Sequence, residues 1–196
     1  MQRWVVTGPL GAGKSLAVRH LAARGAAVVD GDAAGHALLT EPAVRRAIGE
    51  AFGAAVLRGG VVDRAALGAL VFRDASALRR LDAIMLPRLA ERLRAALAAA
   101  ADGAARLAVL EAAVYFLMPA PGPIDLVVCI MADPRTRLRR LTAAGRWTAE
   151  EARRRIAAQA HLEPLWAGAD VRLTNEGEPA ALKAALDRLL AERLPA

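Results

Sequence analysis

Residues 8–15 have the sequence Gly-Pro-Leu-Gly-Ala-Gly-Lys-Ser and match the pattern G-x-x-x-x-G-K-[ST]. In such a segment the glycines let backbone amides turn inward as a nest for an anion, and the following helix adds partial positive charge. Lys14 would place a charge on the β- and γ-phosphates of a nucleotide, and the Ser15 hydroxyl would coordinate Mg²⁺. The alternative is a glycine turn that only caps a helix.

The pattern predicts ATP and Mg²⁺ as cofactors, with Ser15 as a metal ligand. Lys14 is one of two lysines in the chain, and it falls inside this segment. We assign it both a binding and a catalytic role. The residues predicted to hold the nucleotide through this loop are Gly8, Leu10, Gly11, Ala12, Gly13, Lys14 and Ser15.

A second candidate is Asp30-Gly31-Asp32, which lies at the carboxyl end of an apolar run. Ligands of open α/β sheets collect at this end of the strands. In an extended chain both carboxylates can face the same side, and the small residue between them leaves room for a substrate. One carboxylate would accept the proton of an attacking hydroxyl, and Asp30 would position Mg²⁺ through water. The alternative is that Asp32 only caps a helix beginning at Ala33.

Arginines are dense between residues 135 and 155, and most of them are expected on solvated helix faces. Arg140 and Arg146 flank the turn between two predicted helices, where a lid would close over a triphosphate and stabilise developing charge. We therefore predict Arg140 as a catalytic residue and Arg146 as a nucleotide-binding residue. Arg155 is a further candidate.

Strands and helices alternate along the part of the chain that must position these groups. Short apolar runs predict strands at 3–7, 26–30, 106–110, 124–131 and 171–173. Apolar residues at helical spacing predict helices at 15–24, 134–143 and 179–193. Thr148 and Glu151 form a capping box that opens another helix through Gln159. The first strand, helix and second strand imply a parallel sheet with a right-handed connection.

Between residue 33 and about residue 99 the sequence predicts helices and no strand. The helical stretches lie near 33–39, 42–52, 64–72 and 76–99 and are separated by Gly53 and by Gly59-Gly60. Pro87 should break or kink the last of them. The fold class is therefore α/β: three layers around a five-stranded, mainly parallel sheet, with a helical insertion and a helical hairpin.

The chain has 196 residues, enough for one domain or a domain with a small insertion. Hydrophobic residues make up 56% and charged residues 24%, which excludes a disordered tail and a membrane bundle. No apolar run reaches the ~18 residues of a membrane span, and no signal-peptide pattern is present, so we expect a cytosolic protein without a membrane partner.

The net charge of +7 suits an anionic partner. Aromatic residues are only 4% and are not interleaved with basic ones, so a phosphorylated small molecule is favoured and no nucleic acid is expected. The single cysteine, Cys129, lies in an apolar run and is expected to be a buried core thiol. His20, His36 and His161 share no ligand spacing, so no structural zinc is expected.

Over nearly its full length and in order, the chain resembles the dephospho-CoA kinase family. These P-loop kinases phosphorylate the ribose 3′-hydroxyl of dephospho-CoA in the last step of coenzyme A synthesis. Residues 6–15 look like the family's phosphate loop, and residues 28–32 are similar to its Asp-x-Asp, whose second aspartate is the proposed base. That role falls on Asp32. The resemblance implies that the substrate is bound by Asp30, Asp32, Arg64 and Glu111.

The most discriminating stretch is residues 60–67, followed by Val71-Phe72 and Asp74, which resembles the family's Gly-x-Leu-Asp-Arg-x-x-Leu and Val-Phe-x-Asp signature. Residues 155–159 are similar to its Arg-Ile-x-x-Gln, and residues 175–177 to its Asn-x-Gly loop beside adenine, so Asn175 is a candidate base contact. The implied domains are a nucleotide-binding core (1–32, 104–134 and 160–196), a helical substrate domain (33–103) and a lid (135–159).

Three positions depart from the family pattern. Leu86-Pro87 stands where the family has His-Pro, Leu117 replaces an acid while Glu111 keeps a carboxylate nearby, and Ala144-Gly145 aligns with an Arg-Asp pair of the lid. These departures lie on the substrate side and in the lid. They leave two alternatives open: a kinase for another small hydroxyl compound, such as a nucleoside, nucleotide or sugar acid, and a nucleotide-binding relative that transfers no phosphate. The oligomeric state is not indicated.

Overall fold

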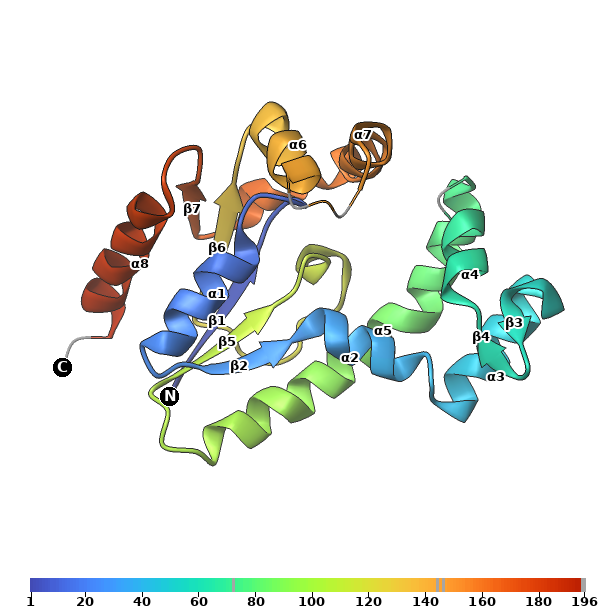
Figure 1. Ribbon diagram of the computed structural model, residues 1–196. Coiled ribbons are helices and arrows are strands. Elements are labelled where there is room, and N and C mark those ends of the chain that lie inside the picture. Colours follow the sequence, from blue (N-terminus) through green and yellow to red (C-terminus); the bar gives the residue numbers. More distant parts are fainter. Residues whose placement is uncertain (72, 144, 146, 195–196) are drawn as a thin grey trace.

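A five-stranded parallel sheet forms the centre of the computed structural model, which describes residues 1–71, 73–143, 145 and 147–194 (Figure 1). The strand order is β2-β5-β1-β6-β7, and every pairing in this sheet is parallel. The strands are β1 (Gln2–Thr7), β2 (Ala27–Asp30), β5 (Leu107–Glu111), β6 (Leu126–Met131) and β7 (Val171–Thr174). The predicted five-stranded α/β fold is confirmed, and the sheet is parallel throughout.

Helices cover both faces of the sheet, which explains why its strands are continuous apolar runs. On one face, α1 (Lys14–Ala23) and α8 (Pro179–Arg193) pack against Trp4 and Val6 of β1. On the other face, the second half of α5 (Ala75–Ala101) packs against Val5. Because successive side chains of a strand point to opposite faces, β1 contributes to both cores.

The carboxyl ends of three neighbouring strands lie at one edge of the sheet. In the strand register, Glu111 at the end of β5 lies beside both Asp30 of β2 and Val6 of β1. Gly8 follows β1 directly. The sheet thus brings the predicted phosphate loop and the carboxylates of Asp30 and Glu111 to the same edge, although the three are far apart in the sequence.

A mainly helical segment follows β2 and extends away from the sheet (Figure 1). It contains α2 (Gly31–Leu38), α3 (Pro42–Phe52), the 3₁₀ turn η1 (Ala54–Val56), α4 (Arg64–Val71) and the first half of α5. These helices enclose a small core of their own, with Val44, Ile48 and Leu67 among its members. The helices predicted here are present, and Phe72, the last residue predicted for the third of them, lies outside the described residues.

Two details of this segment differ from the prediction. The region contains a two-stranded antiparallel ribbon, β3 (Leu57–Arg58) and β4 (Val61–Val62), in place of a helix-only insertion. Each strand is too short to show a period of two, and Gly59-Gly60, with φ of 58° and 77°, forms the turn that joins them. Pro87 was predicted to break or kink α5, and the predicted break is absent because the helix continues through Pro87. This residue lies where the helix leaves the small core and joins the sheet core, which provide packing on both sides.

Two helices between β6 and β7 form the predicted hairpin: α6 (Pro134–Ala143) and α7 (Ala149–Ala158). The capping box of α7 is present as predicted, with the Thr148 hydroxyl accepting from the Glu151 amide and the Glu151 carboxylate accepting from the Thr148 amide. The 3₁₀ turns η3 (Ala160–Leu162) and η4 (Leu165–Gly168) lead on to β7. Leu162 and Trp166 cover Cys129, and burial raises the pKa of this thiol to about 11. Cys129 is therefore the buried core thiol that the sequence predicts.

Candidate active site

The loop of residues 8–15 joins β1 to α1 and turns sharply at its glycines. Gly13 has φ of 110° and precedes α1 in the N-cap position. Because glycine has no side chain, the first amides of α1 carry no side-chain cap and keep their donors for an anion. A Cβ at Gly13 would lie 2.3 Å from Asn175 Nδ2, and one at Gly8 would lie 2.2 Å from the Ile130 carbonyl oxygen. The loop geometry therefore depends on glycine at both places.

Lys14 folds back over this loop. Its Nζ donates to the carbonyl oxygens of Gly8 at 2.9 Å and Pro9 at 3.1 Å. Burial lowers the pKa of Lys14, and the nearby carboxylates of Glu111 and Asp32 oppose this shift. A bound phosphate would add negative charge beside the ammonium and stabilise it further.

Ser15 begins the same helix and donates its hydroxyl proton to Glu111 Oε1 at 2.9 Å. The sheet register explains this contact, since Glu111 ends the strand beside β1. A hydroxyl and a carboxylate are the kind of oxygen ligands that Mg²⁺ prefers. Glu111, predicted as a substrate ligand, thus lies beside the residue predicted to hold the metal.

The Asp30-Gly31-Asp32 segment is not extended, which corrects the geometry expected from the sequence. Asp30 ends β2 and is itself the N-cap of α2, because its Oδ1 accepts from the Ala33 amide at 2.9 Å. Asp32 is therefore not the cap; it lies in the first turn of α2 and is exposed. Gly31 is buried, and a Cβ there would lie 2.6 Å from the Glu111 carbonyl oxygen. The small residue is required by close packing on β5.

Asp32 lines a cavity of about 350 Å³ between α2, α4 and α5. Most of its wall is apolar, with Leu67 and Leu89 among the lining residues. The polar side chains at the wall include His36 and Arg64, which are 2.7 Å apart between Nε2 and Nη2. Arg64 begins α4, whose amino end is capped by Asp63 through the amides of Ala65 and Ala66.

Two further clefts continue from this cavity toward α7. The first, of about 650 Å³, shares Arg64 and Gly68 with the cavity and adds Arg155. The second, of about 580 Å³, shares Arg155 and also has Arg73 and Arg154 in its wall. The Arg155 guanidinium lies 4.5 Å from the centre of the Trp147 ring. The apolar cavity beside Asp32 is therefore continuous with these two clefts, which are lined by arginines and are together called the arginine cleft below.

Arg140 of α6 and Asn175 both contact the Ala12 carbonyl of the phosphate loop. Asn175 Nδ2 donates to the Ala12 carbonyl at 2.7 Å, and the same carbonyl accepts a longer bond of 3.4 Å from Arg140 Nη1. Arg140 Nη2 also lies 3.5 Å from Asn175 Oδ1. Both predicted residues are thus in contact with the loop. Arg146 lies outside the described residues.

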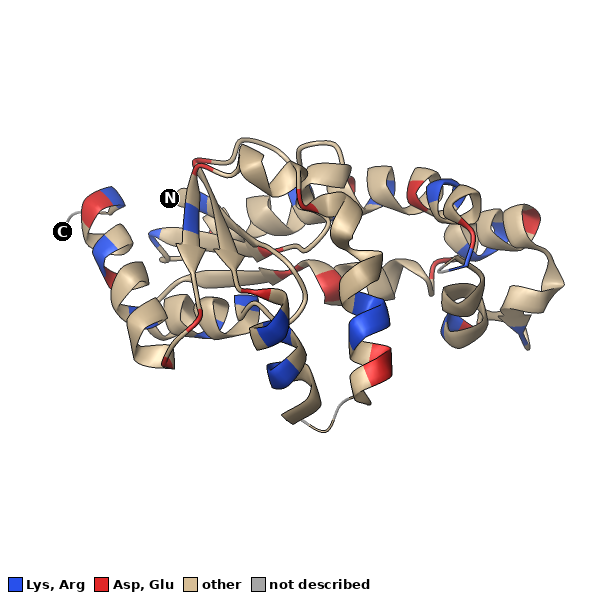
Figure 2. Cartoon of the chain, turned by 90° about the horizontal axis from the view of Figure 1, so that it is seen from above, with Lys and Arg blue, Asp and Glu red and all other residues tan. Residues whose placement is uncertain are grey.

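Two residues for which the sequence predicted no role in the site also contact the loop, although Gln159 ends the segment that resembles the family's Arg-Ile-x-x-Gln. Gln159 Oε1 accepts from the Leu10 amide at 2.8 Å. Arg137, expected on a solvated helix face, is only 3% exposed. A Cβ added at Gly11 would lie 3.2 Å from the Cβ of Arg137, so this side chain packs directly on the loop. Arg137 precedes the buried Leu141 by four residues, so helical spacing was the signal that both share one face. Blue segments in Figure 2 mark basic residues on both α6 and α7.

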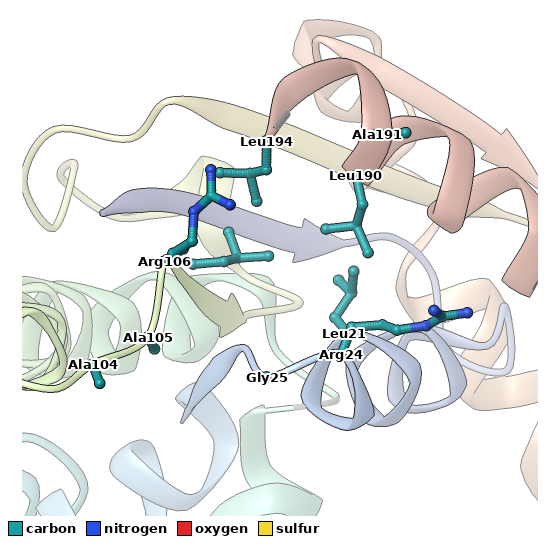
Figure 3. A pocket seen from close by; sticks show the side chains of 10 residues that line it. Leu21, Arg24, Gly25, Ala104, Ala105, Arg106, Leu190, Ala191 and Leu194 are labelled. Atoms are coloured by element: carbon teal, nitrogen blue, oxygen red, sulfur yellow. The ribbon is translucent and has the colours of Figure 1, made fainter. Parts of the chain in front are cut away.

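A separate cavity of about 380 Å³ lies at the opposite end of the sheet (Figure 3). Leu21, Leu190 and Leu194 line it, together with Arg24 and Arg106 near the amino ends of β2 and β5. Arg24 pairs with Asp187 at 2.8 Å. Because the phosphate loop and Asp32 follow the carboxyl ends of the strands, this cavity takes no part in the site. In the described part of the chain, every helix falls short of the length and apolarity that crossing a bilayer requires.

Comparison with known proteins confirms the family resemblance seen in the sequence, through a family model, through relatives and through solved structures. The family model described as dephospho-CoA kinase matches residues 4–181. The dephospho-CoA kinase of Geobacter sulfurreducens is 34% identical over 192 residues, covering 97% of this chain and 98% of the relative. That of Anaeromyxobacter dehalogenans is 38% identical over 190 residues, covering 95% and 90%.

Among solved structures, the crystal structure of TT1252 from Thermus thermophilus has a TM-score of 0.76 and 30% identity and covers 98% of this chain and 97% of that one. A shikimate kinase from Acinetobacter baumannii, with a TM-score of 0.52, 16% identity and coverage of 99% and 96%, shares the fold. The family match spans the phosphate loop, the Asp32 cavity and the arginine cleft. The chain belongs to the dephospho-CoA kinase family, the P-loop kinases that phosphorylate dephospho-CoA to coenzyme A.

Proposed function

We propose that this protein transfers the γ-phosphoryl group of ATP to the ribose 3′-hydroxyl of dephospho-CoA, with Asp32 as the general base. The position of Asp32 carries the proposal. Asp32 lines the apolar cavity, and its negative charge opposes the lowering of the Lys14 pKa that burial causes. A base between an acceptor cavity and the charge that holds the phosphates suits direct transfer to a hydroxyl.

The triphosphate would lie on the amides of residues 8–15, with Lys14 at the β- and γ-phosphates. Among the described residues, no cluster of three or more His, Cys, Asp or Glu side chains could hold a metal alone. Kinase sites hold Mg²⁺ through one or two protein oxygens together with phosphates and waters, and Ser15 with Glu111 fits that donor set. When bound, Mg²⁺ neutralises charge on the phosphates. Asp30 keeps a proposed role through water.

Asp32 would accept the proton of the 3′-hydroxyl as the hydroxyl oxygen attacks phosphorus. Its exposure favours this role, since the carboxylate is open to an incoming substrate. Most of the remaining catalysis would come from positioning and charge, because phosphoryl transfer needs little covalent help from the protein. Arg140 would shield charge on the transferring group, together with Arg146.

The acceptor suits the shape of the described clefts. Dephospho-CoA carries an aromatic base, whose flat faces can pack on apolar side chains, and a diphosphate with a long arm on the same ribose. Its reacting hydroxyl therefore lies close to two negative charges. Arg64 is shared by the apolar cavity and the arginine cleft and would bind this diphosphate, with Arg155 beyond it. Asp30, Asp32, Arg64 and Glu111 thus remain the proposed substrate residues.

Three further assignments follow from the family and remain predictions. Residues 33–103 would form the substrate domain and residues 135–159 a lid that excludes water from the transfer, around a core of residues 1–32, 104–134 and 160–196. Asn175 would lie beside the adenine of ATP. A cytosolic location is expected, as for an enzyme of small-molecule synthesis.

Incubation with MgATP and dephospho-CoA, followed by mass spectrometry and ³¹P NMR of the product, tests the proposal. We expect one added phosphate, located on the 3′-oxygen. Coenzyme A is the matched control, because its 3′-hydroxyl is already phosphorylated and it should not react. Turnover of a nucleoside, nucleotide or sugar acid without turnover of dephospho-CoA would contradict the proposed acceptor. Tight MgATP binding without any product would indicate a relative that transfers no phosphate.

A further inference from the structure

Two side-chain carboxamides reach the phosphate loop from distant parts of the chain. Gln159 follows α7 and accepts from the Leu10 amide, and Asn175 follows β7 and donates to the Ala12 carbonyl. The distances are 2.8 Å and 2.7 Å, both short for such bonds. We propose that Gln159 and Asn175 are positioning residues that set the orientation of two loop peptides for nucleotide binding.

The Gln159 bond acts on the peptide between Pro9 and Leu10. In a trans peptide the N–H and C=O groups point in opposite directions. Since Gln159 holds the Leu10 N–H on one side, the Pro9 carbonyl is turned to the other, where Lys14 Nζ lies 3.1 Å away. The Ala12 amide also donates to this carbonyl, at 3.2 Å. Gln159 thereby fixes a carbonyl that holds the catalytic ammonium over the loop.

The Asn175 bond acts on the peptide between Ala12 and Gly13. Because Asn175 holds the Ala12 carbonyl, the Gly13 N–H must point away from Asn175. Asn175 is itself firmly held: it is 4% exposed, and its backbone N–H donates to the Met131 carbonyl at 2.8 Å. The 2.3 Å separation between Nδ2 and a Cβ at Gly13 shows how closely the carboxamide packs on the loop.

The two contacts have opposite hydrogen-bond polarity, and this makes the proposal testable. Position 159 must supply an acceptor, so Gln159→Glu keeps the bond and Gln159→Met, of similar size, loses it. Position 175 must supply a donor, so Asn175→Asp loses the bond although it keeps the shape. A role in filling space alone would predict that all three near-isosteric variants behave alike.

The measurement is the Kd of MgADP by calorimetry, together with hydrogen exchange of the loop amides in the nucleotide-free protein. We expect Gln159→Met and Asn175→Asp to raise the Kd about tenfold each, the value of one hydrogen bond, and Gln159→Met to speed exchange at Leu10. Gln159→Glu should retain slow exchange at Leu10. Because exchange is measured without nucleotide, repulsion between the added negative charge and the phosphates does not affect it.

Wild-type Kd values and unchanged exchange in Gln159→Met and Asn175→Asp would overturn the proposal. Asn175 is buried, so thermal unfolding of each variant is recorded first; if Asn175→Asp fails to fold, the pair Gln159→Met and Gln159→Glu decides the question at the less buried site. The probe is MgADP without any acceptor, so the result is independent of which acceptor the enzyme phosphorylates.

Discussion

The nucleotide side and the acceptor side of the site are built in different ways. Around the phosphate loop, backbone groups are held by buried or half-buried partners: Lys14, Gln159 and Asn175 each bond to a loop peptide. Around the acceptor cavity, Asp32 and Arg64 are exposed. The difference leads us to expect that the fold itself presets the loop proposed to bind the triphosphate, whereas the proposed acceptor side is completed only when its ligand binds.

The largest effect should come from removing the base. Asp32→Asn should lower kcat by about 10²–10⁴, the usual contribution of a general base, and leave the Kd of ATP nearly unchanged. Asp30→Asn is the comparison variant: asparagine also caps helices well, so α2 should persist, and loss of the proposed contact of Asp30 with Mg²⁺ through water should lower kcat less than loss of the base. Steady-state kinetics with calorimetric titration of ATP would check this. A slow Asp30→Asn enzyme beside a normal Asp32→Asn enzyme would move the base to Asp30.

On the nucleotide side, Gly13→Ala should weaken ATP binding by about tenfold to a hundredfold, from backbone strain of 1–3 kcal/mol and the clash with Asn175. Gly25→Ala is the control, because Gly25 has φ of 90° but no atom within 4 Å of its added Cβ. It should lose some stability and bind ATP normally. Calorimetric Kd values and melting temperatures of both variants provide the test. Equal ATP affinity in Gly13→Ala and Gly25→Ala would contradict the expectation that ATP binding depends on the backbone conformation of the phosphate loop.

On the acceptor side, Arg64→Ala should raise the KM for dephospho-CoA about tenfold, the loss expected for one charge-assisted hydrogen bond, without changing the Kd of ATP. Arg58→Ala controls for charge in the same segment, since Arg58 is exposed and pairs only loosely with Asp63 at 3.4 Å. Initial-rate kinetics at saturating ATP measure both. A weaker Kd of ATP in Arg64→Ala would contradict the assignment of Arg64 to the acceptor side alone.

The smallest effect is a proton taken up with the nucleotide. Burial lowers the pKa of Lys14 in the free protein, and the bound phosphates favour the ammonium and raise that pKa. Between these two pKa values, binding takes up protons, so ATP affinity falls as the pH rises through the lowered pKa of the free protein. Calorimetry at alkaline pH in buffers of different ionisation enthalpy should detect this uptake, and Lys14→Ala should abolish it. Proton release on binding would contradict the assigned direction.

Much of the fold could be predicted because its signals are local. The β-branched run before Gly8 predicts β1, Thr148 and Glu151 predict the start of α7, and the limits of α8 follow from Pro179 and the apolar spacing. The ribbon of β3 and β4 was missed because two-residue strands carry no periodic signal. The capping role of Asp30 was missed because both aspartates are good caps, and only the start of α2 distinguishes them.

The sequence by itself determined the chemistry, because a glycine-rich turn, a lysine and a serine at fixed spacing identify a phosphate loop within eight consecutive residues. Tertiary structure alone decided which distant side chains serve that site. Glu111 reaches Ser15 through strand register, and Gln159 and Asn175 reach the loop because α7 and β7 fold back onto it. Such contacts join residues far apart in the chain, and only sheet and helix packing brings them within hydrogen-bonding distance.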